Sequence, residues 1–143
     1  MDASGAATEY EDIVREEWID HNEHMNLAYY VLVFTDALAR LRARFGIAGG
    51  ARLTQMHTVY EREVKLGDRL RVSTHVLGVQ PSRLHLFQAM FHADEGYRAA
   101  TCESVAACDQ VFPPPLRDRL AALIPAAAPD GAGRRITMPA RPK

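Results

Sequence analysis

The segment from Trp18 to Asn26 concentrates side chains that suit acyl transfer. Six of its nine residues carry polar side chains that form hydrogen bonds, and an apolar helical pattern follows directly. The start of a helix presents unpaired N–H groups and the positive end of its dipole, which stabilise a carbonyl oxygen that acquires negative charge. The Asp20 carboxylate could attack a thioester carbonyl or activate a water molecule for that attack. The segment therefore favours acyl transfer to water.

The same residue types also have a purely structural interpretation. Asp20, Asn22 and Asn26 belong to the types that most often form turns and cap helices. The spacing of His21 and His24 is that of a metal-ligand pair, but no third carboxylate or thiolate stands at a suitable spacing. We therefore predict no metal site.

One long helix must position this segment. From Leu27 to Phe45, apolar residues recur at steps of three and four, which predicts an amphipathic helix. Gly46 can end it as a left-handed cap. The polar segment should then lie at the N-terminus of the helix.

Strand patterns surround this helix. We predict a first strand over residues 10–20 and, after a Gly49-Gly50 break, four antiparallel strands over residues 53–65, 70–77, 83–92 and 99–109. The strand with apolar residues on both faces, 83–92, should be central. The small residues of the last strand should let the helix cross it closely. A proline run precedes a short helix at 116–123. Residues 1–8 should be frayed, and the tail from residue 125 should be ordered only if it docks on another part of the protein.

Composition indicates one globular domain over residues 1–143, with a core at 9–111 and a C-terminal helix and tail at 112–143. With 143 residues, 48% of them hydrophobic, the chain can bury a core without disulfide or metal staples. Seventeen basic and eighteen acidic side chains give a net charge of -1, which argues against nucleic-acid binding. Apolar runs are too short for a bilayer, and no secretory signal is recognisable. Cys102 and Cys108 match neither a zinc nor a redox motif. We expect a cytoplasmic protein without membrane or nucleic-acid partners.

The run from Asp20 to Tyr30, DHNEHMNLAYY, resembles the signature of hotdog-fold acyl-CoA thioesterases of the 4-hydroxybenzoyl-CoA thioesterase type. The stretch EVKLGD at residues 63–68 and the strand order are also similar, so the resemblance covers about residues 10–110. The segments at 83–87, 113–114 and 133–136 are similar to betainyl-CoA thioesterases of carnitine breakdown. The resemblance implies an α+β hotdog fold, in which a five-stranded antiparallel sheet wraps around one long central helix and a short C-terminal helix follows.

This resemblance also implies catalytic roles. Asp20 would be the nucleophile or general base, and the backbone N–H near Leu27 would be the oxyanion donor. Three further residues would position the turn, the substrate carbonyl or the water: Asn22, His24 and Asn26. The family usually has glycine where this chain has Glu23, so Glu23 either alters the shape of the loop or adds a second acid near the thioester.

Substrate contacts follow from the same resemblance. Hotdog sites form between subunits, which implies a homodimer or homotetramer in which the partner's strand 53–65 lines the pocket. His57 and Tyr60 are candidates on that strand, although His57 also suits a structural role. The quaternary ammonium of a betainyl group suits aromatic faces and acids, and the further candidates for it are Trp18, Tyr29 and Glu23.

Coenzyme A would enter as part of the substrate, and no cofactor is expected. Lys65 and Arg83 flank turns, where they can hold its phosphates or be solvated surface charges. Arg134 and Arg135 on the tail can likewise hold phosphates of coenzyme A or be solvated surface charges. Glu103 lies among small apolar residues, so it should either pair with a histidine or arginine or face the site.

Two other functions fit parts of this pattern. A hotdog enoyl-CoA hydratase would carry its catalytic histidine five residues after the aspartate, where this chain has Met25. A non-catalytic acyl-CoA binding module on the same fold would bind thioesters without releasing a thiol. Asp20 in the expected turn favours the thioesterase.

Overall fold

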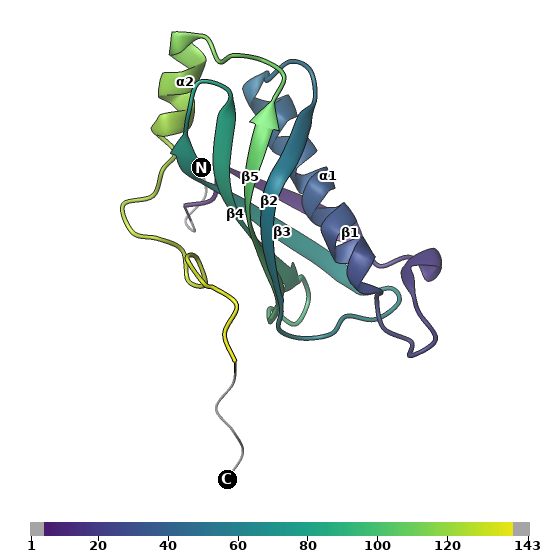
Figure 1. The fold of residues 1–143 in the computed structure, drawn as a ribbon. Coiled ribbons are helices and arrows are strands. Elements are labelled where there is room, and N and C mark those ends of the chain that lie inside the picture. The colour runs from purple at the N-terminus through teal and green to yellow at the C-terminus, as the bar shows by residue number, and fades with distance from the viewer. Residues whose placement is uncertain (1–4, 139–143) are drawn as a thin grey trace.

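One antiparallel sheet and one long helix make up most of the computed structural model, which describes residues 5–138. The strands are β1 (Thr8–Ile13), β2 (Ala51–Tyr60), β3 (Arg69–Val79), β4 (Arg83–His92) and β5 (Arg98–Cys108). They pair in the order β1-β3-β4-β5-β2, and helix α1 (Leu27–Phe45) lies against one face of the sheet (Figure 1). Helix α2 (Pro114–Ala121) follows the sheet. This is the α+β arrangement that the hotdog resemblance implies.

Helix α1 begins and ends where the sequence indicates. The Asn26 side chain accepts the N–H of Ala28 at 3.0 Å and caps the first turn. Gly46 ends the helix in the left-handed conformation, with φ of 65°. One face is buried against the sheet and consists of Tyr30, Val33, Phe34, Ala37, Leu38 and Leu41.

The centre of the sheet is tied to this helix by a buried amide. Gln88 on β4, the central strand as predicted, donates to the carbonyl of Phe34 at 2.9 Å and to the Thr74 hydroxyl at 3.2 Å. The small residues of β5 predict that α1 crosses that strand closely. This prediction is wrong for the helix backbone, which comes nearest to β1 and β3. Large helix side chains such as Phe34 fill the space over the small residues of β5, and Cys102 shares one apolar cluster with them.

The first strand is shorter than predicted. It ends at Ile13, and a 3-10 turn at Glu16–Trp18 replaces the rest. This turn carries Trp18 into the core, where the side chain is 3% exposed. In the other direction, the pairing continues past Thr8, because the Ala7 N–H donates to the carbonyl of Thr74 at 2.8 Å. Ala6 and Ala7 are therefore packed, not frayed as predicted, whereas residues 1–4 of that prediction lie outside the described residues.

Strand β2 ends at Tyr60, five residues earlier than predicted. The N–H groups of Glu61 and Arg62 both donate to one carbonyl, that of Ala99, at 2.8 and 3.0 Å. Two consecutive residues then share one partner position, so the ladder cannot continue. The chain leaves the sheet here and runs toward the turn that precedes α1.

The C-terminal tail docks on the sheet through residues 130–134, whereas Ile136 and Met138 beyond them are 90% and 91% exposed. After α2 it runs beside the sheet on the side away from α1 (Figure 1). Gly131 lies close to the ring of Phe87. The Phe87 side chain is on the outer face of the sheet and is only 1% exposed. Within residues 5–138, no helix is long and apolar enough to cross a bilayer.

Candidate active site

The turn before α1 is closed by Asp20. Its N–H donates to the His24 carbonyl at 3.1 Å, and its own carbonyl accepts the N–H of Glu23 at 3.0 Å. Its side-chain Oδ1 accepts the N–H of Asn22 at 2.9 Å. One carboxylate oxygen therefore has the structural role expected of an Asx turn. The other, Oδ2, has no partner within the part of the chain that the structure describes, and is available to a substrate.

Glu23 adopts a backbone conformation that favours glycine. Its φ is 65°, and it is the one non-glycine residue with positive φ among residues 5–138. Such a conformation costs an L-residue about 1 kcal/mol or more. The turn thus keeps the left-handed shape that a glycine would adopt readily. The Glu23 side chain is exposed and lines a neighbouring hollow of about 530 Å³ with Lys65.

Asn26 leaves one backbone donor of α1 unpaired. Its side chain accepts the N–H of Ala28, and its carbonyl accepts the N–H of Tyr29 at 3.0 Å. The N–H of Leu27, which lies between Asn26 and Ala28, has no acceptor among the described residues. As the first residue of α1, Leu27 carries this donor at the positive end of the helix dipole. It is therefore suited to bind an oxyanion.

Asp20 and Leu27 line the same cavity, of about 570 Å³. Its walls come from three places: the turn, the start of α1 and the chain that leaves β2. The other lining residues are Asn22, His24, Met25, Tyr30, Tyr60, Glu61, Arg62 and Glu63. The structure thus brings together a carboxylate, a helix N-terminus and a space for a substrate. Of the predicted contacts, Asn22, His24 and Tyr60 join them.

Two side-chain pairs shape this cavity. His24 Nε2 lies 3.0 Å from Glu63 Oε2. The rings of Tyr30 and Tyr60 meet edge to face, with centroids 5.2 Å apart. Burial raises the pKa of Tyr30 to about 12, so this hydroxyl stays protonated at neutral pH. Tyr60 is more exposed and presents aromatic surface to the cavity.

Glu61 is held in the cavity wall by two arginines. Arg98 donates to Oε1 at 2.6 Å and to Oε2 at 2.9 Å, and Arg134 donates to Oε2 at 3.1 Å. Hydrogen bonds from Arg98 lower the pKa of Glu61, against the opposing effect of burial and with further help from Arg134. Glu61 therefore stays ionised, and its charge is balanced by its partners.

Several predicted contacts lie outside this cavity. Trp18 stacks on Tyr29, with ring centroids 5.6 Å apart. Trp18 belongs to the buried apolar cluster between α1 and the sheet, and Tyr29 packs against that cluster. Arg83 begins β4 at the end of the strand opposite to His92. His92 contacts Asp68 at 3.3 Å, in the loop whose Lys65 pairs with His24 of the Asp20 turn. Within one chain, Arg83 is thus remote from Asp20.

The sequence does not predict the part of the Asp20 cavity wall that is formed by the chain after β2. Glu61, Arg62 and Glu63 line the cavity, whereas the sequence predicts that the strand continues through them. The polar run Glu-Arg-Glu directly after the apolar Val59-Tyr60 pair is the one signal that could mark a strand end. Tyr30, on the apolar face of α1, is buried and also contributes to the cavity.

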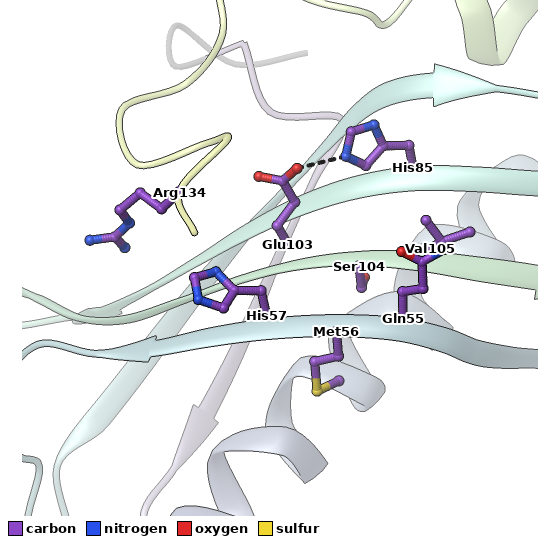
Figure 2. A pocket seen from close by; sticks show the side chains of 8 residues that line it. All are labelled: Gln55, Met56, His57, His85, Glu103, Ser104, Val105 and Arg134. Atoms are coloured by element: carbon purple, nitrogen blue, oxygen red, sulfur yellow. Dashed lines mark hydrogen bonds and ion pairs between the residues drawn. The ribbon is translucent and has the colours of Figure 1, made fainter. Parts of the chain in front are cut away.

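A second, smaller cavity of about 190 Å³ lies on the outer sheet face (Figure 2). His57 and Glu103 are opposite each other on β2 and β5, and Glu103 Oε2 lies 2.8 Å from His85 Nε2. Its Oε1 accepts the N–H of Gly133 at 2.6 Å. Burial disfavours the charged form of Glu103, but the Gly133 N–H and His85 outweigh it and lower its pKa. The predicted pairing of Glu103 with a histidine is confirmed, and within one chain His57 lies apart from the Asp20 cavity.

Comparisons with known proteins agree with this geometry. The model of the thioesterase-like superfamily matches residues 14–122. The chain is 31% identical to the betainyl-CoA thioesterase of Pseudomonas aeruginosa, over 95% of this chain and 98% of that protein. It is 30% identical to the L-carnitine dehydrogenase/betainyl-CoA thioesterase of Rhizobium meliloti, over 95% of this chain but 31% of that longer protein.

Solved structures with a similar fold agree with these sequence matches. A Pseudomonas putida KT2440 protein, assigned provisionally as a thioesterase, superposes with a TM-score of 0.82 at 31% identity, over 92% of this chain and 96% of that one. A hypothetical protein from Staphylococcus aureus, solved in complex with CoA, superposes with a TM-score of 0.75 at 27% identity, over 92% and 94% of the two chains.

Proposed function

Because this chain belongs to the thioesterase-like superfamily, we propose that the cavity beside Asp20 is its active site and that its substrate is betainyl-CoA. The chain is a thioester hydrolase of the acyl-CoA class. The proposal therefore concerns which residues act and which acyl group they accept. The observation that carries it is the shared cavity of the Asp20 carboxylate and the unpaired N–H of Leu27.

Asp20 can act by either of two routes. As a nucleophile, Oδ2 adds to the thioester carbonyl and the C–S bond breaks, so that CoA leaves as the thiolate. Water then adds to the acyl carbonyl of the acyl-aspartyl anhydride, which releases the acid and restores the carboxylate, and a proton from that water passes to the CoA sulfur. As a general base, Oδ2 takes a proton from water while the water oxygen adds to the carbonyl, and that proton passes to the departing CoA sulfur. In both routes the Leu27 N–H and the helix dipole stabilise the oxyanion. Neither route calls for a metal ion, and we propose that none takes part.

The lining of the cavity supports a cationic acyl group. A trimethylammonium group donates no hydrogen bond and is attracted to aromatic faces and carboxylates. Tyr60 presents aromatic surface, and Asp20 and Glu63 add acidic groups. Glu61 contributes less, because Arg98 and Arg134 already balance its charge. Tyr60 and Glu63 are therefore the groups that we propose to contact the ammonium end.

We also propose that chains associate as homodimers or homotetramers through β2. This strand lies at one edge of the sheet, and an open edge readily pairs with another strand. It carries exposed Met56 and Tyr60, and the neighbouring helix start carries Leu27, which is 57% exposed. Pairing of two such edges would cover these apolar side chains and bring a second chain beside the cavity. Sedimentation at several protein concentrations tests this, and a monomer throughout contradicts it.

A panel of three thioesters tests the substrate. Thiol release is followed for betainyl-CoA, for 3,3-dimethylbutanoyl-CoA, which has the same shape without the charge, and for 4-hydroxybenzoyl-CoA. We expect kcat/KM to be highest for betainyl-CoA, by about tenfold over its uncharged analogue, since one exposed cation-π contact and one ion pair differ between them. Equal rates for the charged and uncharged pair contradict the betainyl proposal. Tight binding of all three without thiol release would indicate an acyl-CoA binding module instead.

A further inference from the structure

The tail segment 129–134 is built as a compact turn. The N–H of Ala132 donates to the Pro129 carbonyl at 3.0 Å, and Arg134 Nε donates to the Gly131 carbonyl at 3.2 Å. Gly133 donates its N–H to Glu103 on β5. The segment is therefore folded on itself and attached to the sheet by polar contacts.

Gly131 allows this close attachment. Its φ is 97°, and a Cβ at this position would lie 3.3 Å from both Phe87 Cζ and Arg98 Nη1. The backbone of the segment thus rests directly on the outer face of the sheet. A larger residue would be strained and would push the segment away.

From this position the segment reaches the wall of the Asp20 cavity. Arg134 donates to Glu61, and its other terminal nitrogen donates to the Thr101 hydroxyl. Arg98, which pairs with the same glutamate, also donates to the Asp130 carbonyl at 2.7 Å. Both arginines that hold Glu61 are thus in contact with the tail segment.

Glu61 depends on these contacts because the strand ladder has already ended there. Beyond Tyr60 the chain has lost regular pairing, although the Glu63 carbonyl still accepts the Tyr97 hydroxyl at 2.8 Å. A carboxylate held by two guanidinium groups is more firmly oriented than one held by a single partner. The tail therefore contributes to the position of residues 61–63.

We propose that segment 129–134 completes the active site, with Arg134 as a positioning residue that acts through Glu61 on the cavity wall. This inference rests on the proposed function of the Asp20 cavity. Residues 129–134 lie beyond the part of the chain, 14–122, that the family model matches. Membership of the family therefore does not by itself supply this role.

The test compares two neighbouring arginines in the full-length protein. Arg134→Gln removes the contact with Glu61 together with those to Thr101 and the Gly131 carbonyl. Arg135→Gln is the matched control, because Arg135 directly follows the segment and is exposed. KM and kcat are measured with whichever thioester of the panel above is hydrolysed fastest. We expect Arg134→Gln to raise KM about tenfold, with kcat changed less than about threefold, since it loses the charge-assisted contacts that orient the wall but no reacting group. Arg135→Gln should leave both constants within about twofold.

Two further variants separate positioning from general stabilisation. In a Glu61→Gln background, Arg134→Gln should change KM by less than about twofold, because its partner is already altered. Gly131→Ala should raise KM as Arg134→Gln does, while melting temperatures report whether each variant is folded.

Either of two results would overturn the inference. One is that Arg134→Gln behaves like Arg135→Gln, and the other is that its effect persists undiminished without Glu61. Failure of the proposed function is seen separately, as retained turnover in Asp20→Asn.

Discussion

Asn26 accepts the N–H of Ala28 at 3.0 Å, and the adjacent Leu27, whose own N–H has no acceptor among residues 5–138, lines the same cavity as Asp20. The helix cap and the proposed oxyanion donor are thus neighbouring groups at the start of α1. A residue that suits a structural interpretation can therefore also be needed for catalysis.

Asn26→Ala should lower both stability and turnover. Loss of the cap costs about 1 kcal/mol, which corresponds to a decrease in Tm of about 4 °C for a domain of this size. A frayed first turn also places the Leu27 N–H less accurately, so kcat should fall about tenfold or more. Asn26→Ser keeps a capping oxygen and should restore much of both. A variant with lower Tm but unchanged kcat would limit Asn26 to a structural role.

Asp20→Asn should abolish turnover without unfolding the protein. The amide oxygen of asparagine can still accept the Asn22 N–H and close the turn, but it is neither nucleophile nor base. We expect kcat to fall by about 10³-fold or more and Tm to change by less than about 2 °C. Asp20→Ala, which also loses the turn contact, should be equally inactive and less stable. Turnover near that of the unmodified protein in Asp20→Asn would reject the assignment.

Glu23→Gly should stabilise the protein. Glycine relieves the positive φ of this position, although it adds conformational freedom to the unfolded chain, so we expect a net gain of about 0.5–1 kcal/mol. Glu23→Ala keeps the strained backbone and serves as the control, with no such gain. Chemical denaturation measures both variants. A less stable Glu23→Gly would mean that the glutamate side chain itself contributes to folding.

Acidification should weaken the attachment of the tail. The pKa values of Glu61 and Glu103 are lower in the folded protein than the value of about 4.3 for an unfolded chain. Folding therefore gains stability from both carboxylates above about pH 4.3, and this gain is lost as pH falls through their lowered pKa values. Glu61→Gln and Glu103→Gln should be less stable at pH 7 and less sensitive to acid, with exposed Glu17→Gln as the control. Thermal unfolding from pH 7 to pH 3 measures this, and parallel curves for all four proteins would contradict it.

Removal of divalent metal ions should leave the activity unchanged. The proposed chemistry uses the Asp20 carboxylate and a backbone N–H, neither of which needs a metal to be effective. After dialysis against EDTA, kcat and KM should remain within about twofold of their starting values. Loss of activity that returns on addition of one metal ion would show that the reaction follows another route.

Local signals in the chain were sufficient for the parts of the fold that depend on near neighbours. Apolar periodicity with Asn26 and Gly46 at its ends defines α1, because capping and burial of one face act within a few residues. The apolar residues on both faces of β4 identify the central strand. The turn with Asp20 is recognisable for the same reason, since its hydrogen bonds join residues two to four positions apart.

Tertiary structure alone decided the parts of the cavity that depend on distant partners. Strand β2 ends at Tyr60 because the Ala99 carbonyl, on another strand, accepts two successive N–H groups. Glu61 is oriented by Arg134, which is 73 residues away in the chain. Trp18 faces the core because the 3-10 turn redirects it. Such contacts form between segments that meet only after the sheet has assembled, and no spacing within the sequence encodes which of the available charged residues will come within hydrogen-bond distance.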